Sequence, residues 1–152
     1  MKSKVGILYG MKHMSWFEYK KMGRTSQILK KRISNMQTSL LGNIDVIYTT
    51  NLLVDSYFYE YLLKQILKNY RINPRKEMFN VDESDIEMIF IFFNELNKKF
   101  DTQEKLNWYI QNQYPKYLKK RIYYNLDFSS NSLSDNKQKK KKRKGIFIDT
   151  SY

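Results

Sequence analysis

Short apolar runs in the N-terminal third of the chain predict three β-strands. The run "VGILYGM" (residues 5–11) is apolar, aromatic and bounded by glycine, which is typical of a strand. The stretch "FEYKKMG" (residues 17–23) alternates its side chains with the period of a strand, and the short connection between the two runs indicates a hairpin. A third strand is predicted at "IDVIYTT" (residues 44–50).

Two segments next to these strands have the period of a helix. Apolar residues from Ile28 to Met36 recur at helical spacing, and the hydroxyl of Thr25 or Ser26 could accept the free backbone N–H groups of the first turn. Residues 55–70 also follow a helical pattern and begin with an aspartate that can cap the helix. We therefore expect one helix before the third strand and one helix after it in the sequence.

The C-terminal half predicts helices followed by a polar tail. Residues 77–81 ("EMFNV") indicate a short extended segment, and residues 82–100 a helix with acids at its start and lysines at its end, as the helix dipole favours. Residues 101–124 continue in a helical pattern that Pro115 interrupts. Residues 127–152 are biased to serine, asparagine and lysine and lack core-forming side chains, so we predict that they are disordered.

This order of elements predicts an α/β fold. The series ββαβα gives a small three-stranded mixed sheet flanked by helices, followed by a helical extension. We divide the chain into a domain at 1–81, a helical extension at 82–126 packed on it, and a disordered lysine-rich tail at 127–152.

Composition narrows the choice of partner and compartment. The 152 residues carry a net charge of +13, and a pI near 9.7 favours nucleic acid as the partner. An A/T-rich coding bias, which enriches lysine, is an alternative source of part of this charge. The absence of cysteine excludes disulfide partners and thiol catalysis. No apolar run approaches the roughly 18 residues of a membrane span, and the N-terminus lacks a signal peptide's long apolar region. We expect an intracellular protein that is neither secreted nor bound to a membrane.

Five motifs in the first half of the chain follow one another in a recognisable order. They are "GILY" (6–9), "KMGRT" (21–25), "RISNMQTS" (32–39), "YEYLLKQILKNYR" (59–71) and "KEMFNV" (76–81). Together they resemble the GIY-YIG nuclease superfamily, most closely its phage Orf-172-type branch from phages and large DNA viruses. The resemblance covers residues 5–81.

The resemblance implies a DNA endonuclease that hydrolyses phosphodiester bonds with one Mg²⁺ or Mn²⁺ ion. Two positions depart from the pattern. Lys21 stands where the superfamily signature has tyrosine, although many members of the branch share that change, and Lys64 stands where the branch tends to have histidine. Both departures favour a related module that binds DNA without cleaving it.

Glu60 is the candidate metal ligand and catalytic carboxylate. It lies among tyrosines and leucines, and it is the only acid between Asp55 and Glu77. A carboxylate in such a helix needs a partner, because desolvating a bare charge is costly. Mg²⁺ is commonly held by only one or two carboxylates together with phosphate oxygens and water. The alternative is a structural ion pair, with Arg32 or Lys64 as the partner.

Tyr9 and Arg32 complete the predicted catalytic set. The planar guanidinium of Arg32 suits phosphate oxygens and would balance the charge of the transition state. The resemblance assigns Tyr9 to the attacking water, whereas the strand pattern alone makes it a core residue. A phenol has an unperturbed pKa of about 10, so it needs a neighbouring cation to act as a base. Lys21 would either lower the pKa of Tyr9 or itself bind phosphate. Tyr9, Arg32 and Glu60 should face one space at one edge of the sheet.

A phosphate-binding cradle is predicted before the first helix. Gly23 would stand between a strand and that helix, where the lack of a Cβ permits a tight turn and the close approach of a phosphate. Lys21 and Arg24 flank it, and Lys31 and Lys64 are further candidates for substrate binding. The alternatives are a simple turn for the glycine and a solvated helix face for the lysines.

Several aromatic and basic residues have simpler explanations. His13, the only histidine, should be exposed in the hairpin connection, and Trp16 and Phe17 should pack into the hairpin core, although they could stack on bases. The Phe90–Phe93 cluster should belong to the core. The run "KQKKKKRK" (137–144) is a nuclear-import signal, a DNA-binding tail or a low-complexity run.

Three functions remain open at this point. The favoured one is a metal-dependent DNA endonuclease, acting in the nucleus or in a viral factory if the protein is viral. The second is a DNA-binding module of the same fold with weak or no catalysis. The third is a basic protein that packages DNA, which the lysine-rich tail favours.

Overall fold

The computed structural model describes residues 4–72 and 77–114 of the chain. In chain order the elements are β1 (Ile7–Lys12), the 3-10 helix η1 (Met14–Trp16), β2 (Lys20–Thr25), α1 (Leu29–Gln37), β3 (Asp45–Thr49), α2 (Ser56–Ile66), the 3-10 helix η2 (Lys68–Tyr70), β4 (Met78–Phe79), α3 (Glu83–Lys99) and α4 (Gln103–Asn112).

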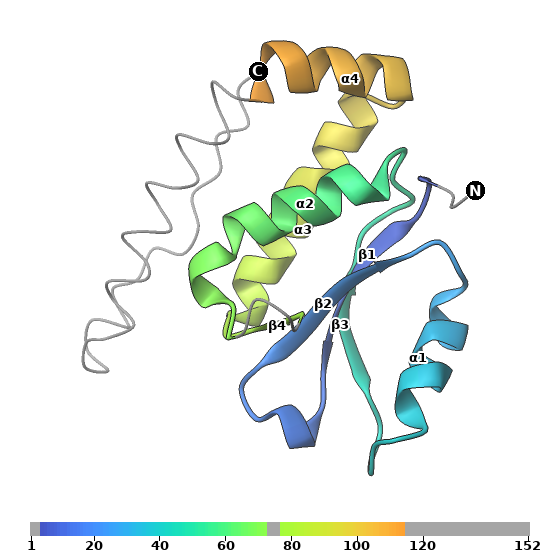
Figure 1. The fold of residues 1–152 in the computed structure, drawn as a ribbon, viewed down its shortest axis with the longest axis vertical. Coiled ribbons are helices and arrows are strands. Elements are labelled where there is room, and N and C mark those ends of the chain that lie inside the picture. Colours follow the sequence, from blue (N-terminus) through green and yellow to red (C-terminus); the bar gives the residue numbers. More distant parts are fainter. Residues whose placement is uncertain (1–3, 73–76, 115–152) are drawn as a thin grey trace.

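The sheet has four strands in the order β3-β1-β2-β4, and every pairing is antiparallel (Figure 1). The expectation of an α/β fold is confirmed, but that of a three-stranded mixed sheet is wrong. The extra strand is the extended segment expected at residues 77–81. Two of its residues, Met78 and Phe79, pair with Lys21 and Lys20 of β2. A two-residue strand depends on its neighbour for its hydrogen bonds, so local sequence shows only an extended segment.

The sheet separates two apolar clusters. Leu8 and Met22 point to one face, where they pack with α2 and α3 in the main core. Tyr9 and Met11 point to the other face, where the partly buried apolar side chains of α1 cover them. This division follows the alternation of side chains along a strand. Figure 1 shows the same arrangement, with α1 across the strands from α2 and α3.

Helix α3 is joined to the sheet domain by packing and by hydrogen bonds. Phe90, Phe92 and Phe93 are buried in the main core, as expected for this cluster, whereas Ile91 is exposed. Asn94 and Asn97 of α3 bind the backbone of the loop at residues 51–54, which leads from β3 into α2. The loop that leads into α2 is therefore held by two side chains of α3.

The predicted N-terminal cap is present in α2 but not in α1. The side chain of Asp55 accepts a hydrogen bond from the backbone N–H of Phe58, which confirms the predicted cap of α2. The predicted cap of α1 is wrong, because Thr25 is the last residue of β2 and its hydroxyl accepts from the backbone N–H of Gln27 instead. Helix α1 begins only at Leu29 and has no side-chain cap.

The hairpin connection reverses two expectations. His13 is buried: Ser15 N donates to its Nδ1 at 3.0 Å, so Nε2 carries the proton and donates to the Gly42 carbonyl at 3.3 Å. Phe17 is 84% exposed and has a φ of 55°, so it does not pack into a core. Trp16 is partly buried beside Tyr9 and Met11, as expected.

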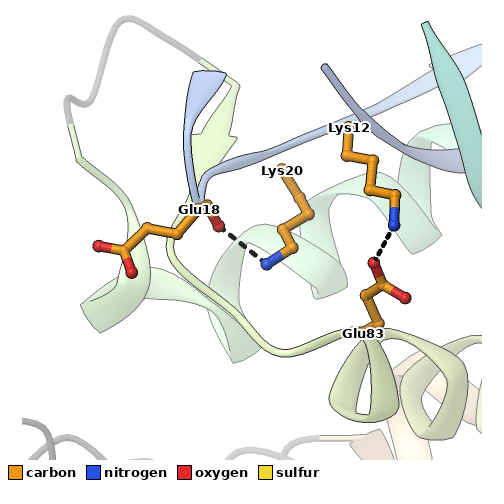
Figure 2. Close-up of polar contacts among 4 residues, drawn as sticks. All are labelled: Lys12, Glu18, Lys20 and Glu83. Atoms are coloured by element: carbon orange, nitrogen blue, oxygen red, sulfur yellow. Dashed lines mark hydrogen bonds and ion pairs between the residues drawn. The ribbon is translucent and has the colours of Figure 1, made fainter. Parts of the chain in front are cut away.

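Two polar contacts lie where the hairpin strands meet their connection. In Figure 2 the ammonium of Lys12, the last residue of β1, reaches the carboxylate of Glu83 at the start of α3, 2.9 Å away. Lys20, the first residue of β2, donates to the backbone oxygen of Glu18 at 2.8 Å. The first contact joins the hairpin to α3, and the second lies within the hairpin.

The helical extension breaks earlier than expected. Helix α3 ends at Lys99, and α4 begins after Thr102, whose side chain accepts from the backbone N–H of Lys105. Pro115, the remainder of the predicted extension and the tail at 127–152 lie outside the described residues. Within 4–72 and 77–114, no helix combines the length and apolar character needed to cross a membrane.

Candidate active site

Tyr9 is the buried centre of the candidate site. It lies in the middle of β1, its side chain is fully buried, and its backbone pairs with Gly23 of β2. The Nε–H of Arg32, in the first turn of α1, donates to Tyr9 Oη at 3.3 Å. One side of the phenol therefore packs among apolar groups, while its oxygen meets a cation.

Gly23 makes room for this tyrosine. It lies within β2 and is buried, so the expectation of a turn between strand and helix is wrong. A Cβ at this position would lie 2.6 Å from Tyr9 Oη and 3.2 Å from Glu77 Oε2. The phenol of Tyr9 and the carboxylate of Glu77 thus occupy the space that a side chain at Gly23 would need.

Helix α2 contributes a glutamate and a lysine one turn apart. Lys64 Nζ lies 3.7 Å from Glu60 Oε1 and 3.8 Å from Glu77 Oε1. The Glu60 side chain is 18% exposed, and those of Lys64 and Glu77 are each 31% exposed. Lys64 therefore forms an ion pair with both carboxylates in a partly desolvated place, as the ion-pair alternative for Glu60 anticipated.

Glu77 is a site residue that the sequence reasoning did not select. It precedes β4, and its backbone oxygen accepts from Met22 N at 3.0 Å, which fixes it beside β2. The signal was present, since Glu77 is the acid of the motif "KEMFNV". Its proximity to Tyr9 and Lys64 arises only when β4 pairs with β2.

Burial dominates the electrostatics of Tyr9. Burial raises the pKa of Tyr9 above its usual value, and the negative charges of Glu77 and Glu60 raise it further, while the hydrogen bond and charge of Arg32 oppose this rise. The expectation that Lys21 lowers the pKa of Tyr9 is therefore wrong, and Arg32 is the cation beside it. The contact with Tyr9 also raises the pKa of Arg32, which stays charged.

The structure thus brings Tyr9, Arg32 and Glu60 into one place, with Lys64 and Glu77 beside them. They come from β1, α1, α2 and the segment before β4. This juxtaposition was expected from the family resemblance, because the three residues fit one set of motifs.

The remaining predicted substrate-binding residues make other contacts or are exposed. Arg24 contacts the first turn of α2, where its Nε donates to Ser56 Oγ at 2.8 Å. Lys21 is half-buried in β2, where it pairs with Met11 and Met78. Lys31 is exposed on α1, as its alternative reading as a solvated helix face anticipated.

Comparison with known protein families identifies the domain. The T5orf172 domain model matches residues 6–94, which is more than half of the chain. The chain belongs to the T5orf172 domain family. This domain is associated with nuclease-like phage proteins, and it indicates a nuclease-like DNA-binding module. Searches of curated proteins and of solved structures gave no match.

The T5orf172 match extends beyond the string of motifs. It begins at Gly6 in "GILY" and ends at Asn94 in α3, so it includes every residue of the cluster around Tyr9 as well as most of α3. Of the two asparagines of α3 that bind the loop before α2, Asn94 is the last residue of the match, and Asn97 lies beyond it.

The candidate site contains carboxylate oxygens that could hold a metal ion. Among the described residues, no three histidine, cysteine, aspartate or glutamate side chains gather as a metal site. Glu60 and Glu77 are nevertheless two carboxylates that share one lysine. This donor set fits a hard divalent cation that also uses water and phosphate oxygens.

Proposed function

We propose that the T5orf172 domain of this chain hydrolyses phosphodiester bonds of DNA at the cluster around Tyr9. The observation that carries this proposal is the convergence of Tyr9, Arg32 and Glu60 from three elements at one place beside β2. A buried phenol, a guanidinium and a carboxylate are groups that can orient water, bind phosphate and hold a metal.

Glu60 would hold Mg²⁺ or Mn²⁺, and Glu77 could supply a second oxygen ligand. When bound, such an ion polarises a phosphoryl oxygen and lowers the pKa of its bound water. Lys64 lies within 4 Å of both carboxylates, at 3.7 Å and 3.8 Å. It would have to move away for the ion to bind, because an ammonium and a divalent cation repel each other.

Arg32 and Tyr9 would act on the substrate as a linked pair. The charge of Arg32 stabilises the extra negative charge of the transition state, and its contact with Tyr9 limits the directions in which it can point. The raised pKa of Tyr9 keeps the phenol protonated at neutral pH. Tyr9 therefore donates a hydrogen bond to water or to phosphate and does not remove a proton as a base.

The direct test is cleavage of supercoiled plasmid DNA in the presence of Mn²⁺, with EDTA as the metal-free control. Glu60→Gln keeps the size of the side chain and removes its charge, so it should abolish the EDTA-sensitive cleavage. Glu95→Gln is the matched control, since it removes the same charge from an exposed position on α3. Equal cleavage by Glu60→Gln and wild type would place the metal elsewhere and refute the proposal.

The second candidate is a module that binds DNA without cleaving it. Lys64 favours it, because this lysine already forms ion pairs with the two carboxylates that a metal would need. Wild-type protein that binds DNA but shows no cleavage with Mn²⁺ or Mg²⁺ would support this module over the nuclease. DNA binding unchanged in Glu60→Gln would agree with it.

A further inference from the structure

Arg24 is held in place by two neighbouring residues of α2. Its Nε donates to Ser56 Oγ at 2.8 Å, and its guanidinium carbon lies 3.8 Å from the centre of the Tyr57 ring. Arg24 is next to Gly23 in β2, so alternation turns it to the opposite face, toward the first turn of α2. The two contacts fix the side chain at its Nε and across its flat face.

Both anchors are themselves well fixed. Ser56 is fully buried, and its hydroxyl donates to the backbone oxygen of Lys4 at 2.7 Å while it accepts from Arg24. Tyr57 follows the cap of α2 and is 36% exposed, so part of its ring contacts Arg24 and part meets solvent. An arginine stacked on an aromatic ring at this distance gains an attraction that survives at the protein surface.

This arrangement prepares Arg24 to bind an anion. A free arginine loses much rotamer freedom when it binds, whereas a side chain that is already ordered loses less. Nε carries one of the five N–H donors of arginine, and the terminal nitrogens carry the fork that binds phosphate oxygens side by side. The contacts at Ser56 and Tyr57 orient this fork.

The position of Arg24 relative to Glu60 relates it to the proposed active site. Ser56 and Glu60 are four residues apart on α2, which corresponds to about 6 Å along the helix. Successive phosphates of one DNA strand are spaced by ~3.4 Å along the duplex axis. A strand with one phosphate at Glu60 therefore carries another within reach of Arg24.

We propose that Ser56 and Tyr57 are positioning residues that hold Arg24 as a preformed clamp for a DNA phosphate one or two steps along the strand from the one at Glu60. This inference rests on the DNA binding of the proposed function and not on its cleavage step. Tyr57 acts through Arg24, so its effect on binding disappears when Arg24 is absent.

The test measures DNA affinity as a function of salt concentration for single and double variants. Arg24→Gln should weaken binding about tenfold and reduce the slope of log K against log salt by about one, because one phosphate contact is lost. Tyr57→Leu keeps the charge and should weaken binding about threefold with little change in slope, because Arg24 must now be ordered on binding. The double variant should bind as Arg24→Gln does.

Two controls separate positioning from other roles of the ring. Tyr57→Phe keeps the ring and should bind as wild type does. Tyr61→Leu removes an exposed tyrosine one turn further along the same helix and should leave affinity unchanged.

Three results would overturn the clamp. They are an unchanged salt slope in Arg24→Gln, additive effects of Arg24→Gln and Tyr57→Leu, and a wild-type protein that does not bind DNA. If the wild-type protein does not cleave DNA but its salt slope is reduced in Arg24→Gln, only the nuclease proposal is refuted. If the wild-type protein cleaves DNA but Arg24→Gln has the same salt slope as wild type, only the clamp is refuted.

Discussion

Replacing Gly23 by alanine tests whether the glycine of "KMGRT" is needed to seat Tyr9. The added Cβ would lie 2.6 Å from Tyr9 Oη and 2.9 Å from Tyr9 Cζ. Attractive contacts between heavy atoms lie near ~3.5–4.0 Å, so both distances are strongly repulsive. Either the ring or the strand has to move.

The size of the effect follows from the surroundings of Tyr9. Its side chain is fully buried, and its oxygen is bound by Arg32, so the ring cannot swing into solvent. Overpacking of this kind typically costs about 1–3 kcal/mol, and weakening the hydrogen bond adds about 0.5–1.5 kcal/mol. Alanine recovers ~0.5–1 kcal/mol through its lower backbone entropy. The net loss of stability should be roughly 1–3 kcal/mol.

Urea denaturation followed by circular dichroism would measure this loss, and Gly10→Ala supplies the comparison. A Cβ at Gly10 would lie 3.2 Å from Met22 Sδ and 3.3 Å from Ile86 Cγ2. A thioether side chain is flexible and can shift by a few tenths of an ångström. Gly10→Ala should therefore cost less than half as much as Gly23→Ala.

Tyr9→Phe in the Gly23→Ala background isolates the contact, because it removes the closest atom. The double variant should be more stable than the sum of the single effects predicts, by at least ~0.5 kcal/mol. The reasoning is refuted if Gly23→Ala costs no more than Gly10→Ala, or if the effects of Tyr9→Phe and Gly23→Ala are additive.

Four further changes follow from other contacts. Folding raises the pKa of Tyr9, so the stability that the protonated phenol contributes is complete below about pH 10 and is lost as the pH rises through the pKa of the folded state. The free energy of unfolding in urea should therefore depend less on pH between about pH 9 and 12 in Tyr9→Phe than in wild type. An unchanged pH dependence in Tyr9→Phe would contradict this. Asn97→Ala leaves Val54 N and Leu52 O without their partner and should lower the free energy of unfolding by about 1–3 kcal/mol, more than Asn94→Ala, which removes one such bond. Lys64→Met should strengthen Mn²⁺ binding in calorimetry, and Lys64→Met combined with Glu60→Gln should reverse the gain; a weaker Mn²⁺ affinity in Lys64→Met would show that the lysine supports the site. Lys12→Ala should leave the thermal midpoint unchanged, because its pair with Glu83 is exposed, and a clear drop would show that this contact fixes the hairpin.

Local sequence was sufficient where local chemistry decides the structure. The strand at Ile7–Lys12 follows from an apolar run, and the start of α2 follows from an aspartate whose side chain accepts from Phe58 N. His13 shows where this information ends. Its burial depends on the Gly42 carbonyl, which lies 29 positions away in the sequence. A polar residue in a short connection gives no local sign of such a partner.

The candidate site shows the same limit. The family resemblance predicted that Tyr9, Arg32 and Glu60 lie together, because the three residues fit one set of motifs on three different elements. Glu77 was missed because its closeness to Lys64 depends on the pairing of β4 with β2. The direction of the pKa shift of Tyr9 was also missed, since it depends on how deeply the ring is buried.

The asparagines of α3 bear on how this domain can be transferred between proteins. A graft that ended after β4 would carry all five motifs, yet it would leave behind the side chains that hold the backbone of Asn51, Leu52 and Val54. That loop sets where α2 begins, and α2 carries Glu60. Recombination that moves the T5orf172 domain as a working unit must therefore include α3 through Asn97, a helix that none of the five motifs touches.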